Sequence, residues 1–128
     1  MKVALWLISI LVAVAFLVTG AMKLTRSRAE LIGRGQAWAE SVPEPGIKAM
    51  GAAEVAGAIG LLLPAVTGIA PLLTPVSAVA LAVMMTGAAV LHYSRGEGAN
   101  VAPPLLLAAL CLFIAWGRLR KNVDRLIE

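Results

Sequence analysis

Four long apolar runs constrain this sequence more than any other feature. They cover approximately residues 3–22, 47–64, 69–92 and 101–117, and each is close to the ~20 residues that a helix needs to cross a bilayer. Water-soluble helices carry a polar stripe, which these runs lack. The chain is 60% hydrophobic and only 14% charged, unlike a soluble globular domain. We therefore predict an all-α integral membrane bundle of four transmembrane helices, forming a single domain over residues 1–128.

Two other interpretations of the apolar runs fit less well. The first run resembles a secretory signal, because Lys2 precedes it and the small residues Thr19, Gly20 and Ala21 follow it. However, it is longer than the ~7–15-residue apolar core of such a signal. A transmembrane β-barrel would require short segments that alternate apolar and polar residues, whereas these runs are continuous. Helices are the remaining way to satisfy the backbone in lipid.

Prolines indicate where the later helices begin and end. Pro64 is predicted to close the second helix. Pro71 and Pro75 are predicted to lie in the first turns of the third helix, and Pro103 and Pro104 in the first turn of the fourth, where a missing amide hydrogen is tolerated.

The connection after the first run is the only sizeable loop. Leu24, Leu31, Trp38 and Val42 recur there at intervals of seven, seven and four residues, which places them on one helical face. We predict a short amphipathic helix lying in the headgroup region, with Trp38 as its interfacial anchor.

The net charge of +4 favours lipid headgroups over nucleic acid as a partner, because the basic residues lie at the ends of the apolar runs. Five basic residues flank the termini, including a basic tail over residues 118–128, and six flank the loop side. This balance does not decide orientation. Because the first helix usually dominates, we expect both termini in the cytoplasm of a cell whose inner membrane holds the chain.

Glu54 is the only acidic residue inside the four runs, and a charge near a helix centre costs about 2.5–3.5 kcal/mol on insertion scales. Lys23 ends the first run and His92 ends the third, so both reach the same half of the bundle as Glu54. We predict that Glu54 points into the bundle and pairs with Lys23 or His92. The sequence leaves open whether this group only orders the helices or also forms a ligand or proton site.

Neither a redox centre nor a metal centre is expected from the residue types present. The chain has one cysteine, Cys111, in the middle of the fourth run, so an intrachain disulfide and a Cys-x-x-Cys motif are excluded. The single histidine leaves no metal-spaced His/Cys set. We therefore expect no intrinsic cofactor, and we interpret Cys111 as a small packing residue.

The order of these residues resembles the DoxX-like family of small bacterial membrane proteins. The resemblance covers roughly residues 1–118 and excludes the basic tail. It rests on an F-x(3)-G-x(2)-K motif, on a Gly-x-x-Glu helix that closes on Leu-Leu-Pro, and on a later histidine; these residues are Phe16, Gly20, Lys23, Gly51, Glu54, Gly57, Leu61, Leu62, Leu63, Pro64 and His92.

This resemblance implies a four-helix membrane fold and an association with bacterial membrane redox complexes. By position, it assigns Lys23, Glu54 and His92 to any pocket, although the family gives them no settled catalytic role. Our first hypothesis is an accessory subunit of a membrane redox system that binds a quinone-like lipid between its helices. The alternatives are a non-catalytic assembly protein and a small-solute or proton pathway. The partners expected are membrane lipid, a membrane or membrane-associated redox protein and a second copy of the chain.

Overall fold

The computed structural model describes the backbone of residues 2–127 and the side chains of residues 2–121. Within this range every regular element is helical, as predicted: α1 Lys2–Thr25, α2 Arg28–Gly33, η1 Ala37–Ser41, α3 Glu44–Thr67, α4 Leu73–Ser94, η2 Gly98–Val101 and α5 Ala102–Ile127. The described residues contain four helices long and apolar enough to cross a membrane, namely α1, α3, α4 and the segment Gly98–Lys121. The chain is therefore a multi-pass membrane protein.

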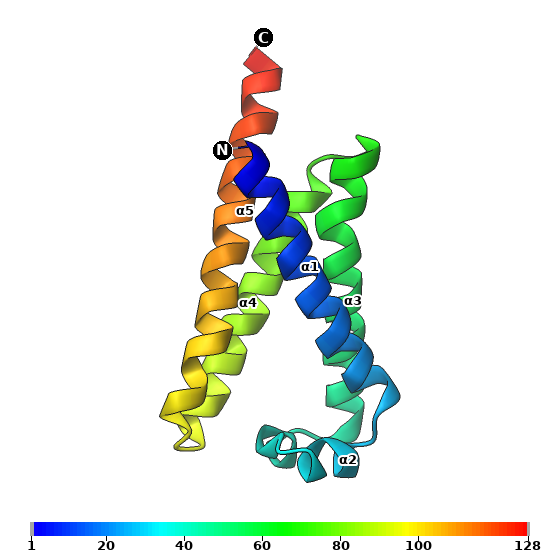
Figure 1. Ribbon diagram of the computed structural model, residues 1–128, viewed down its shortest axis with the longest axis vertical. Helices are drawn as coiled ribbons and strands as arrows, with labels where there is room; N and C mark the ends of the chain where they lie inside the picture. Colours follow the sequence, from blue (N-terminus) through cyan, green and yellow to red (C-terminus); the bar gives the residue numbers. More distant parts are fainter. Residues whose placement is uncertain (1, 128) are drawn as a thin grey trace.

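The four long helices form two pairs. Helix α1 packs mainly on α3, and α5 packs mainly on α4, while α3 also contacts α4. Figure 1 shows the pairs close together near the chain termini and apart at the end where α2 lies. Both termini lie at the same end of the bundle (Figure 1), as an even number of crossings requires.

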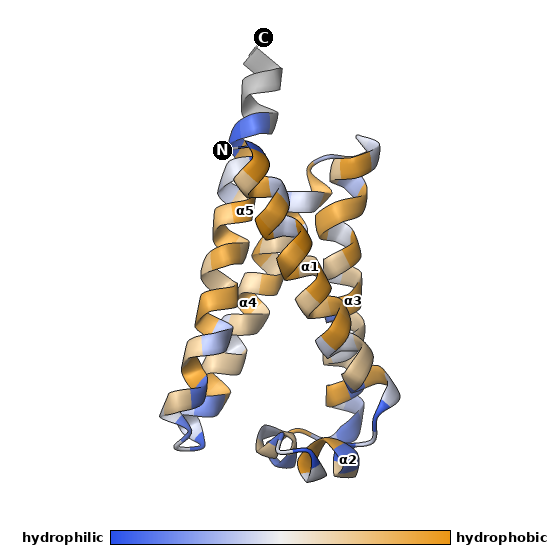
Figure 2. Cartoon of the chain, viewed as in Figure 1, coloured by the Kyte–Doolittle hydropathy of each residue, from blue (hydrophilic) through white to orange (hydrophobic). Residues whose placement is uncertain are grey.

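Apolar side chains fill the interior and also cover the outside. Phe16, Leu61, Leu81 and Ile114 are fully buried where the helices meet. Many other large apolar side chains are exposed along the helices, and Figure 2 shows hydrophilic residues gathered at the two ends. This distribution is the one expected for a bundle surrounded by lipid.

Three of the helix boundaries differ from the prediction. Helix α3 continues through Pro64 to Thr67, where Gly68 in the left-handed conformation (φ 74°) caps it. A proline removes one backbone hydrogen bond, but the apolar surroundings still favour satisfying the others by continuing the helix. Helix α4 begins at Leu73, so Pro71 lies in the preceding turn, whereas Pro75 lies in the first turn as predicted. The fourth helix does not end near residue 117, because the basic tail continues α5.

The segment after α1 is not one continuous amphipathic helix. It divides into α2 and the short 3₁₀ helix η1, with Gly35 (φ 90°) between them. Leu31, Trp38 and Val42 do share a face, but they pack around Ile47 of α3. The segment lies across the end of the bundle where the helix pairs are apart (Figure 1). Insertion of Trp38 into the bilayer interface stays a prediction.

Arg28 holds this segment in its compact shape. Its Nε donates to the carbonyl oxygens of Ala39 (2.8 Å) and Val42 (3.0 Å), and its Nη2 donates to that of Glu40 (2.6 Å). A guanidinium satisfies several carbonyls at once because its donors are fixed in one plane. The basic residue therefore replaces the hydrogen bonds that a longer helix would have provided.

Candidate functional site

The site begins at a close crossing of α1 and α3. A Cβ atom on Gly20 would lie 2.8 Å from the carbonyl oxygen of Gly51, and a Cβ on Gly51 would lie 2.8 Å from that of Gly20. Any side chain at either position would push the backbones apart. The glycines thus bring the neighbouring polar residues of the two helices within hydrogen-bonding distance.

Glu54 lies beside this crossing and pairs with Lys23. The Lys23 Nζ is 2.7 Å from Glu54 Oε1, and the Thr19 hydroxyl donates to Glu54 Oε2 at 3.2 Å. The Glu54 side chain is 1% exposed and that of Lys23 is 13% exposed. Because a buried carboxylate is costly without partners, this arrangement explains how Glu54 is accommodated in an apolar helix.

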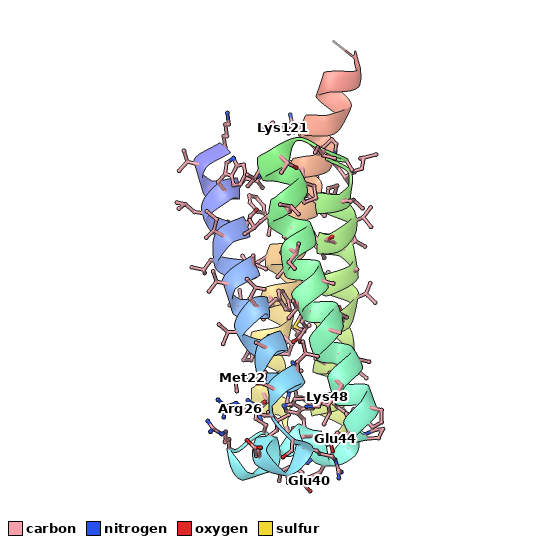
Figure 3. The ribbon with its side chains drawn as sticks, turned by 90° about the vertical axis from the view of Figure 1, so that its right-hand side faces the viewer. Met22, Arg26, Glu40, Glu44, Lys48 and Lys121 are labelled. Carbon is pink, nitrogen blue, oxygen red and sulfur yellow. The ribbon has the colours of Figure 1, made fainter. Side chains whose placement is uncertain are left out.

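A second lysine fixes the end of α1. Lys48 Nζ, on α3, donates to the carbonyl oxygens of Lys23 (3.0 Å), Leu24 (3.1 Å) and Arg26 (2.6 Å). Figure 3 shows Lys48 beside the Met22–Arg26 end of α1. A cation here satisfies carbonyls that have no partner within the helix and complements the negative end of its dipole. Lys48 therefore positions the backbone that carries Lys23.

Trp38 covers the other side of Lys23. The Lys23 Nζ lies 5.4 Å from the centroid of the Trp38 ring, a cation–π geometry, and the indole Nε1 donates to Gln36 Oε1 at 2.7 Å. The residue predicted as a membrane anchor is thus also part of the wall of the site. Gln36 was not among the predicted site residues.

His92 faces the same region but has another partner. Its Nδ1 lies 2.8 Å from Glu97 Oε1, and Glu97 also accepts from Arg95 Nε at 3.2 Å. Arg95 in turn contacts the Ser41 hydroxyl of η1, which links the α4–α5 turn to the segment that crosses the bundle end. Of the two partners predicted for Glu54, the structure shows Lys23.

The Glu97 carboxyl lies outside the membrane-spanning segments and has a shifted pKa. Its hydrogen bond with His92 is the main cause, and it lowers the pKa from the ordinary value of 4.5. Partial desolvation opposes this shift, while the hydrogen bond and the charge of Arg95 reinforce it. Glu97 is therefore held as a carboxylate by the two basic residues.

An inner cavity of about 250 Å³ connects these groups between the two helix pairs. Lys23, Glu54 and His92 all line it, together with Gln36 and Trp38. The rest of its wall is mainly apolar and comes from α1, α3, α4 and α5: Phe16, Met50, Met85, Ala88, Leu91 and Leu107. An apolar cavity with a few convergent polar groups is the usual form of a small-molecule site.

A second cavity of about 270 Å³ adjoins the inner one on the loop side. The two share Gln36, Trp38, His92, Pro103 and Pro104 as lining residues. Trp38 and His92 therefore lie between the inner cavity and the outer one. Among the described residues, no group of three or more His, Cys, Asp or Glu side chains is placed to hold a metal ion.

Sequence reasoning missed three residues of this site. Thr19 could have been found, because it lies one helical turn before Lys23 on the same face. The roles of Gln36 and Lys48 depend on how the loop folds back and on the distance between α1 and α3. No spacing pattern in the sequence carries that information.

Comparison with known proteins agrees with this architecture. No curated protein and no solved structure matches the chain. The model of the DoxX-like family matches residues 7–114, which include Lys23, Glu54, His92 and most of each of the four apolar runs. Since this match covers most of the chain, the protein is a member of the DoxX-like family.

Proposed function

We propose that this protein binds the head group of a quinone-like lipid in the inner cavity and serves as an accessory subunit of a membrane redox system. One observation carries the proposal: Lys23, Glu54 and His92, from three different helices, line one otherwise apolar cavity. A quinone has the matching chemistry, because its two carbonyl oxygens accept hydrogen bonds and its ring and tail are apolar.

The polar groups could hold a carbonyl oxygen without giving up the contacts that order the helices. The Lys23 ammonium has three donor hydrogens, and Glu54 accepts at 2.7 Å from its nitrogen. Nδ1 of His92 donates to the Glu97 carboxylate, so Nε2 can donate to a carbonyl oxygen when the ring carries both protons. Each residue therefore retains hydrogen-bonding capacity for a ligand.

The apolar wall suits the remainder of such a ligand. Met50, Met85 and Leu107 line the inner cavity, and methionine side chains adapt to flat rings because they are flexible and polarizable. Trp38 offers an aromatic face at the boundary with the outer cavity. A head group of one ring fits a volume of about 250 Å³.

A bound quinone would itself supply the electron transfer, and the protein would supply binding and proton donors. The chain has one cysteine, which is too few to ligate an iron–sulfur cluster. A separate redox protein would therefore exchange electrons with the bound quinone, which is why we propose an accessory role.

The first test is analysis of lipids that purify with the protein. The protein would be extracted in a mild detergent, and its bound lipids would be identified by mass spectrometry. We expect a quinone at close to one molecule per chain. A preparation that takes up no quinone, even after incubation with an excess of it, would contradict the proposal and favour the assembly role.

A matched pair of variants tests whether the quinone binds in the inner cavity. Ala88→Leu adds volume to the cavity wall on α4, whereas Ala80→Leu adds the same volume to an exposed position on the same helix. We expect Ala88→Leu to reduce quinone affinity about tenfold or more, since the ligand and the new side chain would compete for space, and Ala80→Leu to have little effect. Equal affinities in both variants would place the ligand elsewhere.

A further inference from the structure

Arg118 lies at the opposite end of the bundle and has an unusual environment. It is only 7% exposed, and its Nε and Nη2 atoms are buried without a hydrogen-bond partner among the residues that the structure describes. The guanidinium lies over the Trp6 ring, with its carbon 4.5 Å from the ring centroid. This contact stabilises the charge but does not use the in-plane N–H donors.

A basic groove of about 440 Å³ opens beside Arg118 between the ends of α1 and α5. Lys2, Arg120 and Lys121 line it together with Arg118, and none of its lining residues within the described side chains, 2–121, is acidic. Figure 3 shows Lys121 at the end of the bundle opposite Lys48. The groove therefore concentrates positive charge around a guanidinium that has unused donors.

The unused donors indicate the charge and shape of the missing partner. A buried arginine cannot lose its proton, so its desolvated N–H groups must be met by acceptors to offset the cost of burial. Phosphate oxygens match the planar fork of a guanidinium in a bidentate geometry. The surrounding lysines and arginine would complement the remaining negative charge.

Apolar side chains beside the groove indicate where the phosphate comes from. Val3 and Leu7 of α1 are 71% and 62% exposed, and Leu112 and Trp116 of α5 are 54% and 49% exposed. Trp116 lines the groove, Leu112 lies one helical turn before it on α5, and Val3 directly follows the groove residue Lys2, so exposed apolar surface adjoins the groove. A free phosphate would leave them uncovered, whereas the acyl chains of a lipid would cover them.

We propose that this groove is a binding site for an anionic phospholipid, with the phosphodiester held by Arg118 and the acyl chains lying along α1 and α5. Arg118 lies outside the residues matched by the family model, 7–114. The site is also lined by none of the residues of the inner cavity. Its existence therefore does not depend on the proposed quinone site.

The test compares lipid binding by two arginine variants in detergent. Arg118→Met keeps an apolar stem and removes the donors, whereas Arg34→Met removes the same charge from an exposed position at the other end. Native mass spectrometry would measure the affinity for phosphatidylglycerol and for zwitterionic phosphatidylcholine. Inorganic phosphate and phosphatidylglycerol would also be titrated separately, with binding of each detected by thermal stabilisation of the wild type.

We expect Arg118→Met to weaken phosphatidylglycerol binding about tenfold or more, because hydrogen bonds to charged groups contribute about 1.5–3 kcal/mol. Arg34→Met should change it less than about twofold. If Arg118→Met does not fold, Arg120→Gln at the exposed rim should still weaken binding, since it removes one of the groove's charges.

Three results would overturn the proposal. The first is equal affinity of the wild type for phosphatidylglycerol and phosphatidylcholine. The second is unchanged phosphatidylglycerol binding in both Arg118→Met and Arg120→Gln. The third is stabilisation by inorganic phosphate that matches the effect of the lipid, which would assign the groove to a soluble anion.

Discussion

At the scale of single residues, the main feature is that basic side chains bind oxygen atoms of other segments. Lys48 and Arg28 bind backbone carbonyls, while Lys23 binds a carboxylate. In an apolar surrounding such multiple contacts offset the loss of hydration. The polar residues at this end of the bundle therefore depend on one another, and removing one should leave its partner buried without a hydrogen bond.

The Lys23–Glu54 pair provides the first prediction. Lys23→Met leaves a buried carboxylate and Glu54→Gln leaves a largely buried ammonium, so each single change should destabilise the protein by about 3–5 kcal/mol. The double variant should lose less than the sum of the two, because no unpaired charge remains. Unfolding in mixed detergent micelles would measure all four proteins. Additive losses would show that the pair does not interact.

Glu97 provides a prediction about pH. Its pKa is lowered in the folded protein, so the carboxylate stabilises the turn at pH values above the ordinary 4.5, and this stabilisation is lost as the pH falls through the lowered pKa. Hydrogen exchange of the Glu97 and Asn100 backbone amides, corrected for intrinsic rates, should therefore become faster as the pH falls from 6 to 3. In Glu97→Gln this pH-dependent change should disappear, while Glu44→Gln should retain it.

At the scale of helices, the existence of the four spans could be predicted from the apolar runs, because each run is long enough to cross a bilayer. The inward position of Glu54 also followed, since a lone carboxylate in such a run must find partners. The partner of His92 could not be predicted, because it depends on the turn that follows α4. There, the Glu97 amide donates to the His92 carbonyl and brings the two side chains together.

The α2–η1 segment and Arg118 are two further features that could not be predicted from the sequence. A seven-residue spacing predicts a shared face, but it does not show that Gly35 would interrupt the helix. Arg118 was interpreted as part of a basic tail, because nothing in the sequence indicates that Trp6 and α5 meet. Both features depend on contacts between segments far apart in the chain.

The crossing of α1 and α3 gives a prediction at this scale. Gly51→Ala would place a Cβ atom 2.8 Å from the Gly20 carbonyl oxygen, so the helices must separate, at a cost of about 1–3 kcal/mol. Gly87→Ala has open space around the new atom and should be neutral or stabilising by up to about 1 kcal/mol. Thermal unfolding in detergent would compare the two. Equal effects would mean that the close approach does not contribute to stability.

At the scale of the whole molecule, the two ends of the bundle differ in chemistry. The inner cavity is lined by Gln36 and Trp38 and so lies at the end covered by α2 and η1, while the basic groove is lined by the terminal ends of α1 and α5. Figure 1 shows these two ends on opposite sides of the bundle. A membrane has two different faces, so this asymmetry requires a defined orientation. The balance of basic residues alone does not determine it.

We predict that both termini face the cytoplasm, because the first helix usually sets the orientation and anionic lipids are attracted to basic segments on that side. A reporter that is active only in the cytoplasm should be active when it is fused after Glu128 and inactive when it is inserted in the α2–η1 segment. An inactive terminal fusion together with an active inserted reporter would reverse the assignment.

Because the two helix pairs diverge from one end, a small rotation at that end would produce a larger displacement at the other. Near the termini, Leu5 of α1 meets Gly117 of α5 so closely that a Cβ on Gly117 would lie 2.7 Å from the Leu5 Cδ1 atom. Helix α1 has 24 residues and is thus roughly 36 Å long, so a rotation of about 5° at this contact would displace its far end by roughly 3 Å. A rotation of α1 together with α3 at this contact would therefore change the width of the inner cavity from almost the length of the membrane away.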